Sequence, residues 1–107
     1  MESREPAPEA CAASAVEVEL TLTTSSLNPG DPSACRGQVV TLQIESEVEG
    51  VLHVHGYDAE LIPIDVGPGL TTEISFDATR SGQFPIELHS EQDSDGSTVG
   101  ILTVYEP

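Results

Sequence analysis

Apolar residues alternate with polar ones in several short stretches of the chain, and this alternation limits the possible folds more than any other feature. In the first stretch, Val16, Val18, Leu20 and Leu22 alternate with Glu and Thr residues. A period of two is typical of a β-strand with one buried face. No window longer than a turn repeats with a helical period. We therefore expect an all-β protein.

Similar stretches follow along the chain. Turn-forming Gly, Pro, Asn, Asp and Ser residues separate them, and residues 25–32 are expected to form a loop. Proline interrupts one stretch, which is typical of a strand at a sheet edge. Six or seven short strands of this kind predict an antiparallel Greek-key β-sandwich or barrel. After the first, the expected strands are residues 38–46, 51–57, an edge segment at 61–64, 70–76, 83–89 and 100–105.

A chain of 107 residues has room for one modest hydrophobic core. Residues 1–14 are rich in Glu, Ala and Pro and have no apolar period, so we expect a flexible leader or stalk there. Residues 15–107 are expected to form the domain. The longest apolar runs are only a few residues, so no membrane span is expected. The sequence does not start with a charged and then apolar leader, so we expect that a signal peptide has been removed.

The charge of the chain restricts its partners. It has 19 acidic and 3 basic residues, a formal net charge of −16, and no lysine. Nucleic acids and anionic membranes are bound through clustered Lys and Arg, so both are excluded as partners. The acidic residues repel one another, so the fold should gain stability as salt screens them. The acidic runs 45–49 and 91–96 are expected to be solvated rather than to bind calcium.

The two cysteines, Cys11 and Cys35, lie in turn-like segments. An isolated pair with no histidine nearby, in a short acidic domain, favours a disulfide over two free thiols or a metal-binding pair. A disulfide here would close a loop of about 25 residues and contribute on the order of 3 kcal/mol in the chain-entropy model. It would place the protein in an oxidising compartment, so a secreted, periplasmic or cell-surface location is expected.

Three segments carry a resemblance to a known family. Residues 53–58 read His-Val-His-Gly-Tyr-Asp, residues 68–76 form a Pro-Gly turn and a Thr-rich strand, and residues 84–89 read Phe-Pro-Ile-Glu-Leu-His. Their order resembles the cupredoxin superfamily over about residues 16–105. It is similar to small secreted cupredoxin-like proteins of bacteria that carry a His-x-His-Gly-Tyr-Asp segment. The resemblance implies a cupredoxin-like sandwich in which the two histidine-bearing strands can lie side by side.

The chain departs from the copper proteins of this superfamily at decisive positions. In comparison with multicopper oxidases, Leu88 stands where a copper-binding cysteine would be, and Glu87 where a histidine would be. The only methionine is Met1, so no axial methionine is available. A blue-copper site needs a thiolate ligand. Electron transfer of that kind is therefore excluded, and so is oxidase chemistry, because no trinuclear set of histidines exists. We expect that the protein is not an enzyme.

The three histidines remain candidates for a metal site. His53 and His55 are two apart on one predicted strand, so their Cα atoms are about 6.6 Å apart and their side chains point the same way. Imidazoles so placed can converge on one ion at bonds of about 2.0–2.1 Å. Together with His89, and with Glu87 as an optional fourth ligand, they would suit copper or zinc. Asp58 could orient a ligand by hydrogen bonding.

Two functional hypotheses follow from these residues. In the first, a secreted or periplasmic cupredoxin-like domain binds or handles copper, alternatively zinc, without blue-copper electron transfer. In the second, a metal-free domain of the cell envelope keeps the fold for a structural or protein-interaction role, and its histidines hydrogen-bond to Glu87, Asp58 or the backbone. The expected partner is accordingly a metal ion or an envelope protein.

Overall fold

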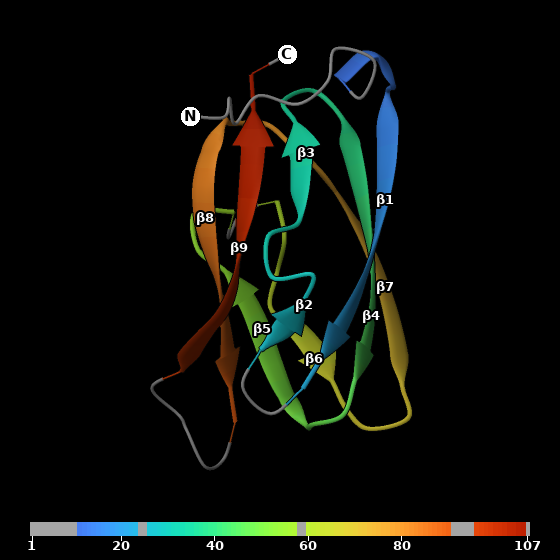
Figure 1. The fold of residues 1–107 in the computed structure, drawn as a ribbon, viewed down its shortest axis with the longest axis vertical. Helices are drawn as coiled ribbons and strands as arrows, with labels where there is room; N and C mark the ends of the chain where they lie inside the picture. Colours follow the sequence, from blue (N-terminus) through green and yellow to red (C-terminus); the bar gives the residue numbers. More distant parts are fainter. Residues whose placement is uncertain (1–10, 24–25, 58–59, 91–95, 107) are drawn as a thin grey trace.

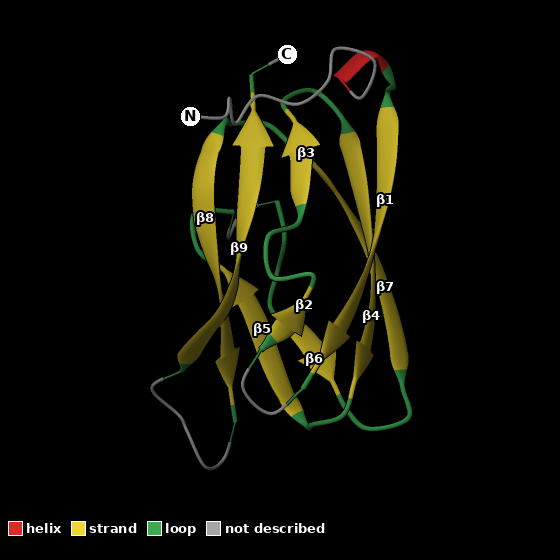
Figure 2. Cartoon of the chain, in the orientation of Figure 1, coloured by secondary structure: helices red, strands yellow, loops and turns green. Residues whose placement is uncertain are grey.

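The computed structural model describes residues 11–23, 26–57, 60–90 and 96–106. Within these ranges strands account for most of the chain, and a helical segment is present at residues 11–12 (Figure 2). No helix in the described ranges is long and apolar enough to cross a membrane. The strands are β1 (Ala15–Leu22), β2 (Leu27–Asn28), β3 (Ser33–Cys35), β4 (Val39–Ser46), β5 (Gly50–Val54), β6 (Ile64–Val66), β7 (Thr71–Asp77), β8 (Gly82–His89) and β9 (Ser97–Tyr105).

The strands form two sheets that pack face to face (Figure 1). One sheet has the order β2-β1-β4-β7 and the other has the order β3-β9-β8-β5-β6. The pairs β1–β4 and β3–β9 are parallel, whereas the other pairs are antiparallel. The prediction of an antiparallel sandwich therefore holds for most pairs. The parallel pair β1–β4 arises because the chain crosses to the opposite sheet through β3 before it returns, as a parallel connection requires.

The predicted alternation places the core as expected. In β4 the apolar side chains Val40, Leu42 and Ile44 are buried, and the residues between them are more exposed. Strand β6 pairs only with β5 and forms an edge of its sheet. The proline-interrupted edge segment was expected at residues 61–64, so the observed edge strand starts at the last residue of the predicted one. The strands β2 and β3 were not predicted, and β2 lies within the expected loop 25–32. They are two and three residues long, too short to show a period.

The predicted disulfide between Cys11 and Cys35 is present, with Cα atoms 5.4 Å apart. The disulfide fixes Cys11, which was expected to belong to the flexible leader, to strand β3 of the domain. The Gln38 side chain donates to the carbonyl oxygen of Ala13 at 2.9 Å. The backbone N of Val39 donates to the oxygen of Ser14 at 3.0 Å. The flexible leader stays a prediction for residues 1–10, which lie outside the described residues.

Candidate metal centre

The two histidine-bearing strands, β5 and β8, are antiparallel neighbours in the five-stranded sheet. Their register pairs His53 with Glu87 and Leu52 with Leu88. Both leucines are buried in the core. Because strand side chains alternate between faces, His53, Glu87 and His89 lie on the outer face of this sheet. The candidate site therefore lies on the surface of the sandwich.

Strand β5 ends at Val54, three residues before its predicted end, and His55 follows it directly. The backbone N of His55 still donates to the oxygen of Pro85 at 2.9 Å, so His55 stays against β8. The chain turns at Gly56, which has a φ of +92°. A Cβ at Gly56 would lie 2.6 Å from Cδ1 of Phe84. Both the left-handed backbone and this close approach require glycine.

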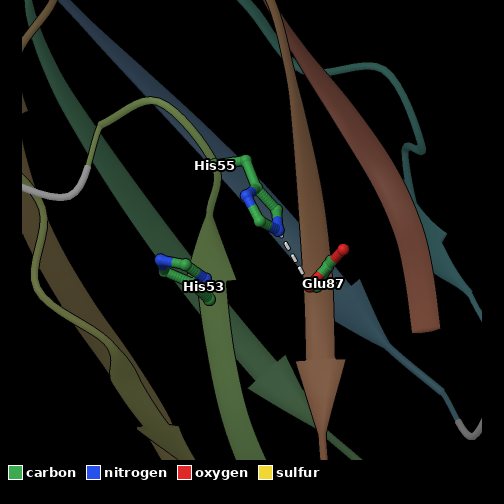
Figure 3. Close-up of side chains that lie close together, drawn as sticks. All are labelled: His53, His55 and Glu87. Atoms are coloured by element: carbon green, nitrogen blue, oxygen red, sulfur yellow. Dashed lines mark ion pairs between the residues drawn. The ribbon is translucent and has the colours of Figure 1, made fainter. Parts of the chain in front are cut away.

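His53, His55 and Glu87 come together on this face (Figure 3). Each offers one possible ligand atom, and these atoms lie within 4.8 Å of one another. The ring centroids of His53 and His55 are 4.8 Å apart. Nε2 of His55 lies 2.9 Å from Oε1 of Glu87, and the two side chains are 47% and 24% exposed. The three groups are therefore within reach of both each other and the solvent.

His89 joins this group through Glu87. Its Nε2 lies 3.3 Å from the same Oε1 of Glu87 that contacts His55, and its ring centroid is 6.3 Å from that of His53. The backbone of Gly96, at a φ of +91°, passes so close to the His89 ring that a Cβ there would lie 2.6 Å from Cε1. The sequence signals nothing about this contact except a glycine after an acidic loop. Asp58, the predicted orienting residue, lies outside the described residues.

The electrostatics of the group favour an ionised carboxylate. The hydrogen bond from His55 is the main cause that lowers the pKa of Glu87 below its ordinary value. Burial opposes this effect, whereas the charge of His55 and the contact with His89 lower the pKa further. Since metal ions bind the deprotonated carboxylate, Glu87 is held in the form of a ligand.

The residues present fit some metal centres and not others. Both cysteines of the chain are joined in the disulfide, and Leu88 is buried among the core residues. A thiolate-ligated blue-copper centre therefore does not fit. Two imidazoles and one carboxylate are donors that zinc accepts in four-coordinate sites, and nitrogen and oxygen donors also suit Cu(II). A copper or zinc centre without sulfur therefore fits.

No family model matches the chain, and no curated protein matches it in sequence. Among solved structures it is similar to the periplasmic domain of subunit II of cytochrome oxidase (CoxB) of Bradyrhizobium japonicum. The TM-score is 0.60 at 16% identity, covering 84% of this chain and 83% of that one. It is also similar to a chain of a heme-copper terminal oxidase dimer, with a TM-score of 0.65 at 16% identity over 82% of this chain.

A third similar structure is the multi-copper oxidase from Pseudomonas thermotolerans, with a TM-score of 0.64 at 16% identity over 86% of this chain. The chain spans 63% of the terminal oxidase chain and 30% of the multi-copper oxidase chain. These likenesses show the fold alone. They confirm the predicted cupredoxin-like, all-β sandwich.

Proposed function

We propose that this cupredoxin-like domain binds copper or zinc outside the cytoplasm, through His53, His55 and Glu87, without blue-copper electron transfer. The observation that supports this most is the convergence of two imidazoles and a carboxylate within 4.8 Å on one exposed sheet face. Copper is the preferred ion on affinity alone, because divalent copper binds such donors more tightly than zinc. The bound ion would supply a Lewis-acidic centre with room for an outside ligand.

The chain's own residues then have distinct roles. His53 lies within the β5–β8 ladder and presents its ring from a fixed strand. Glu87 provides a carboxylate whose pKa is lowered, so that it stays ionised in mildly acidic solution. His89 contacts Glu87 and orients it, as hydrogen-bonded partners of metal ligands commonly do. No residue is assigned a catalytic role, and the domain is proposed to bind a metal ion rather than to catalyse a reaction.

Two observations support a location outside the cytoplasm. The disulfide Cys11–Cys35 is typical of proteins from oxidising compartments. One of the similar structures is a periplasmic domain. We infer a secreted, periplasmic or cell-surface protein, whose metal would be exchanged with the surrounding solution or with an envelope protein.

Metal titration tests the proposal. Cu(II) or Zn(II) added to the purified protein should raise the melting temperature, because a ligand at 100 times its Kd stabilises the folded state by about 2.7 kcal/mol. The variant His55→Ala/Glu87→Ala should lose the shift. Glu73→Ala, on a strand of the opposite sheet, is the matched control and should keep it. Absence of a shift at millimolar metal, or an equal shift in the double variant, would contradict the proposal.

One observation favours the metal-free alternative, a structural or interaction domain of the cell envelope. Glu87 contacts both His55 and His89, so these groups already have partners within the protein. In the described part of the chain, no buried side-chain nitrogen or oxygen lacks a hydrogen-bond partner. A folded protein that shows no metal-induced shift would support this alternative.

A further inference from the structure

The segment that carries His55 is anchored on its core side by a tyrosine. After the turn at Gly56, the side chain of Tyr57 is fully buried. Its hydroxyl donates to the carbonyl oxygen of Arg80 at 2.6 Å and accepts from the backbone N of Arg80 at 3.0 Å. Arg80 lies in the connection between β7 and β8. The buried phenol thus fixes this connection to the end of the histidine-bearing segment.

The side chain of Arg80 closes the same contact from the solvent side. Its guanidinium lies 4.7 Å from the centroid of the Tyr57 ring. It donates to the carbonyl oxygen of Gly56 and to Oε1 of Glu60, the latter at 3.2 Å. Oε2 of Glu60 in turn accepts from the hydroxyl of Thr79 at 2.9 Å. Arg80 is half exposed, yet its guanidinium contacts the Tyr57 and Phe84 rings and donates to Glu60 and to the carbonyl of Gly56. Gly56 is the residue that follows His55.

The turn at Gly56, together with the hydrogen bond from the His55 backbone N to Pro85, sets where His55 lies relative to Glu87. Gly56 packs against the ring of Phe84, which stands on β8 three residues before Glu87. His53 is held within the β5–β8 ladder, whereas His55 lies beyond the end of β5. The backbone of His55 therefore depends more on the turn that follows it than His53 does.

We propose that Arg80 is a positioning residue for the candidate metal centre. By holding the carbonyl of Gly56, it keeps the turn against β8 and sets the separation of His55 Nε2 from Glu87 Oε1. The effect on metal binding rests on the proposed function, whereas the effect on the His55 ring does not. Arg80 acts through the backbone and reaches none of the ligand atoms directly in the described contacts.

Arg80→Met is the first test, because methionine keeps an apolar stem over Tyr57 and removes every donor. It should weaken copper or zinc binding about 10-fold, the usual lower range for loss of a residue that supports metal ligands. Arg80→Lys should recover part of the affinity, since an ammonium can still donate to the Gly56 carbonyl. Arg36→Met is the matched control and should bind metal like the wild type. Arg36 is also paired with a glutamate, and its side chain is similarly exposed, at 46% against 50%.

Imidazole NMR of the metal-free protein provides the second readout. Arg80→Met should shift the ring signals of His55 more than those of His53, whose ring centroid lies 4.8 Å away, whereas a general loss of stability would not single out His55. Wild-type affinity together with unchanged His55 signals would overturn the inference. If the wild type binds no metal, the proposed function fails and the NMR result alone decides the positioning role. Should Arg80→Met not fold, Glu60→Ala, which removes one partner of Arg80, is measured in the same two ways.

Discussion

At the scale of single residues, one carboxylate oxygen organises the candidate site. Oε1 of Glu87 contacts His55 at 2.9 Å and His89 at 3.3 Å. The period of two predicted that His53 and His55 share one face of their strand and that Glu87 and His89 share one face of theirs. The resemblance to cupredoxins predicted that the two strands can lie side by side. Hydrogen bonds from the histidines to Glu87 were one of the expectations, but the sequence could not show which histidines make them. That depends on the strand register and on side-chain rotamers, which only the assembled sheet determines.

A second glutamate leads to a prediction about acid stability. The pKa of Glu106 is lowered by the hydrogen bond from Arg36 first, and then by that from Ser81. A carboxyl whose pKa is lower in the folded state stabilises the fold above its ordinary pKa of about 4.3, and this contribution disappears as the pH falls through the folded value. Glu106→Gln should therefore melt below the wild type at pH 7.

The difference in melting temperature between Glu106→Gln and the wild type should shrink as the pH falls through the folded-state pKa of Glu106, because the carboxyl of the wild type then becomes protonated in the folded state as well as in the unfolded state. Thermal unfolding measured from pH 7 to pH 3 checks this. Because Glu106 and Arg36 are exposed, the difference should also decrease in high salt. A difference that is constant across this pH range would show that the charge of Glu106 does not contribute.

At the scale of elements, the long strands could be predicted and the connections between them could not. Strands β1, β4, β7 and β8 follow the alternation of apolar residues closely. Strand β9 departs from it, because Leu102, Thr103 and Val104 are all buried. The parallel pairs depend on where the chain crosses between sheets, which local patterns do not encode. The early end of β5 depends on contacts of Gly56 with Phe84, and the anchoring by Arg80 joins residues 24 positions apart. Such contacts exist only after the sheets have formed.

A comparison of two glycines separates the cost of a left-handed backbone from the cost of a clash with a neighbouring side chain. Gly56 and Gly37 both have a left-handed φ, +92° and +99°. A Cβ at Gly56 would collide with Phe84, whereas a Cβ at Gly37 would meet nothing within 4 Å. Gly37→Ala should cost about 1–3 kcal/mol from backbone strain alone. Gly56→Ala should cost clearly more, because the aromatic ring must also move. Urea unfolding measures both, and equal losses would mean that Phe84 gives way freely.

At the scale of the whole molecule, few of the acidic side chains are paired with a basic one. Both described arginines are paired with glutamates, Arg36 with Glu106 and Arg80 with Glu60. On the four-stranded sheet, the register aligns Glu19 with Gln43 and Gln43 with Glu73. Glu19 and Glu73 thus lie on this outer face two strand spacings, or about 9.6 Å, apart. At a net charge of −16, this arrangement opposes the compact state.

Salt should therefore stabilise the protein. Raising NaCl from about 10 mM to 150 mM shortens the Debye length from about 30 Å to about 8 Å, and we expect a gain on the order of 1 kcal/mol, or about 4–8 °C in melting temperature. The variant Glu19→Gln/Glu73→Gln should melt above the wild type at low salt and lose that advantage at high salt. A melting temperature that does not depend on NaCl would show that the acidic residues do not repel one another appreciably.

The place of β9 has a consequence for when the fold can form. This strand lies between β3 and β8 in the five-stranded sheet, and it pairs Ala34 with Val104, residues that are far apart along the chain. A growing chain therefore cannot complete this sheet until β9 has been synthesised. Until then the core strands lack a neighbour on one side, and folding of the whole domain must wait. A protein that crosses a membrane unfolded and folds on the far side would benefit from this delay.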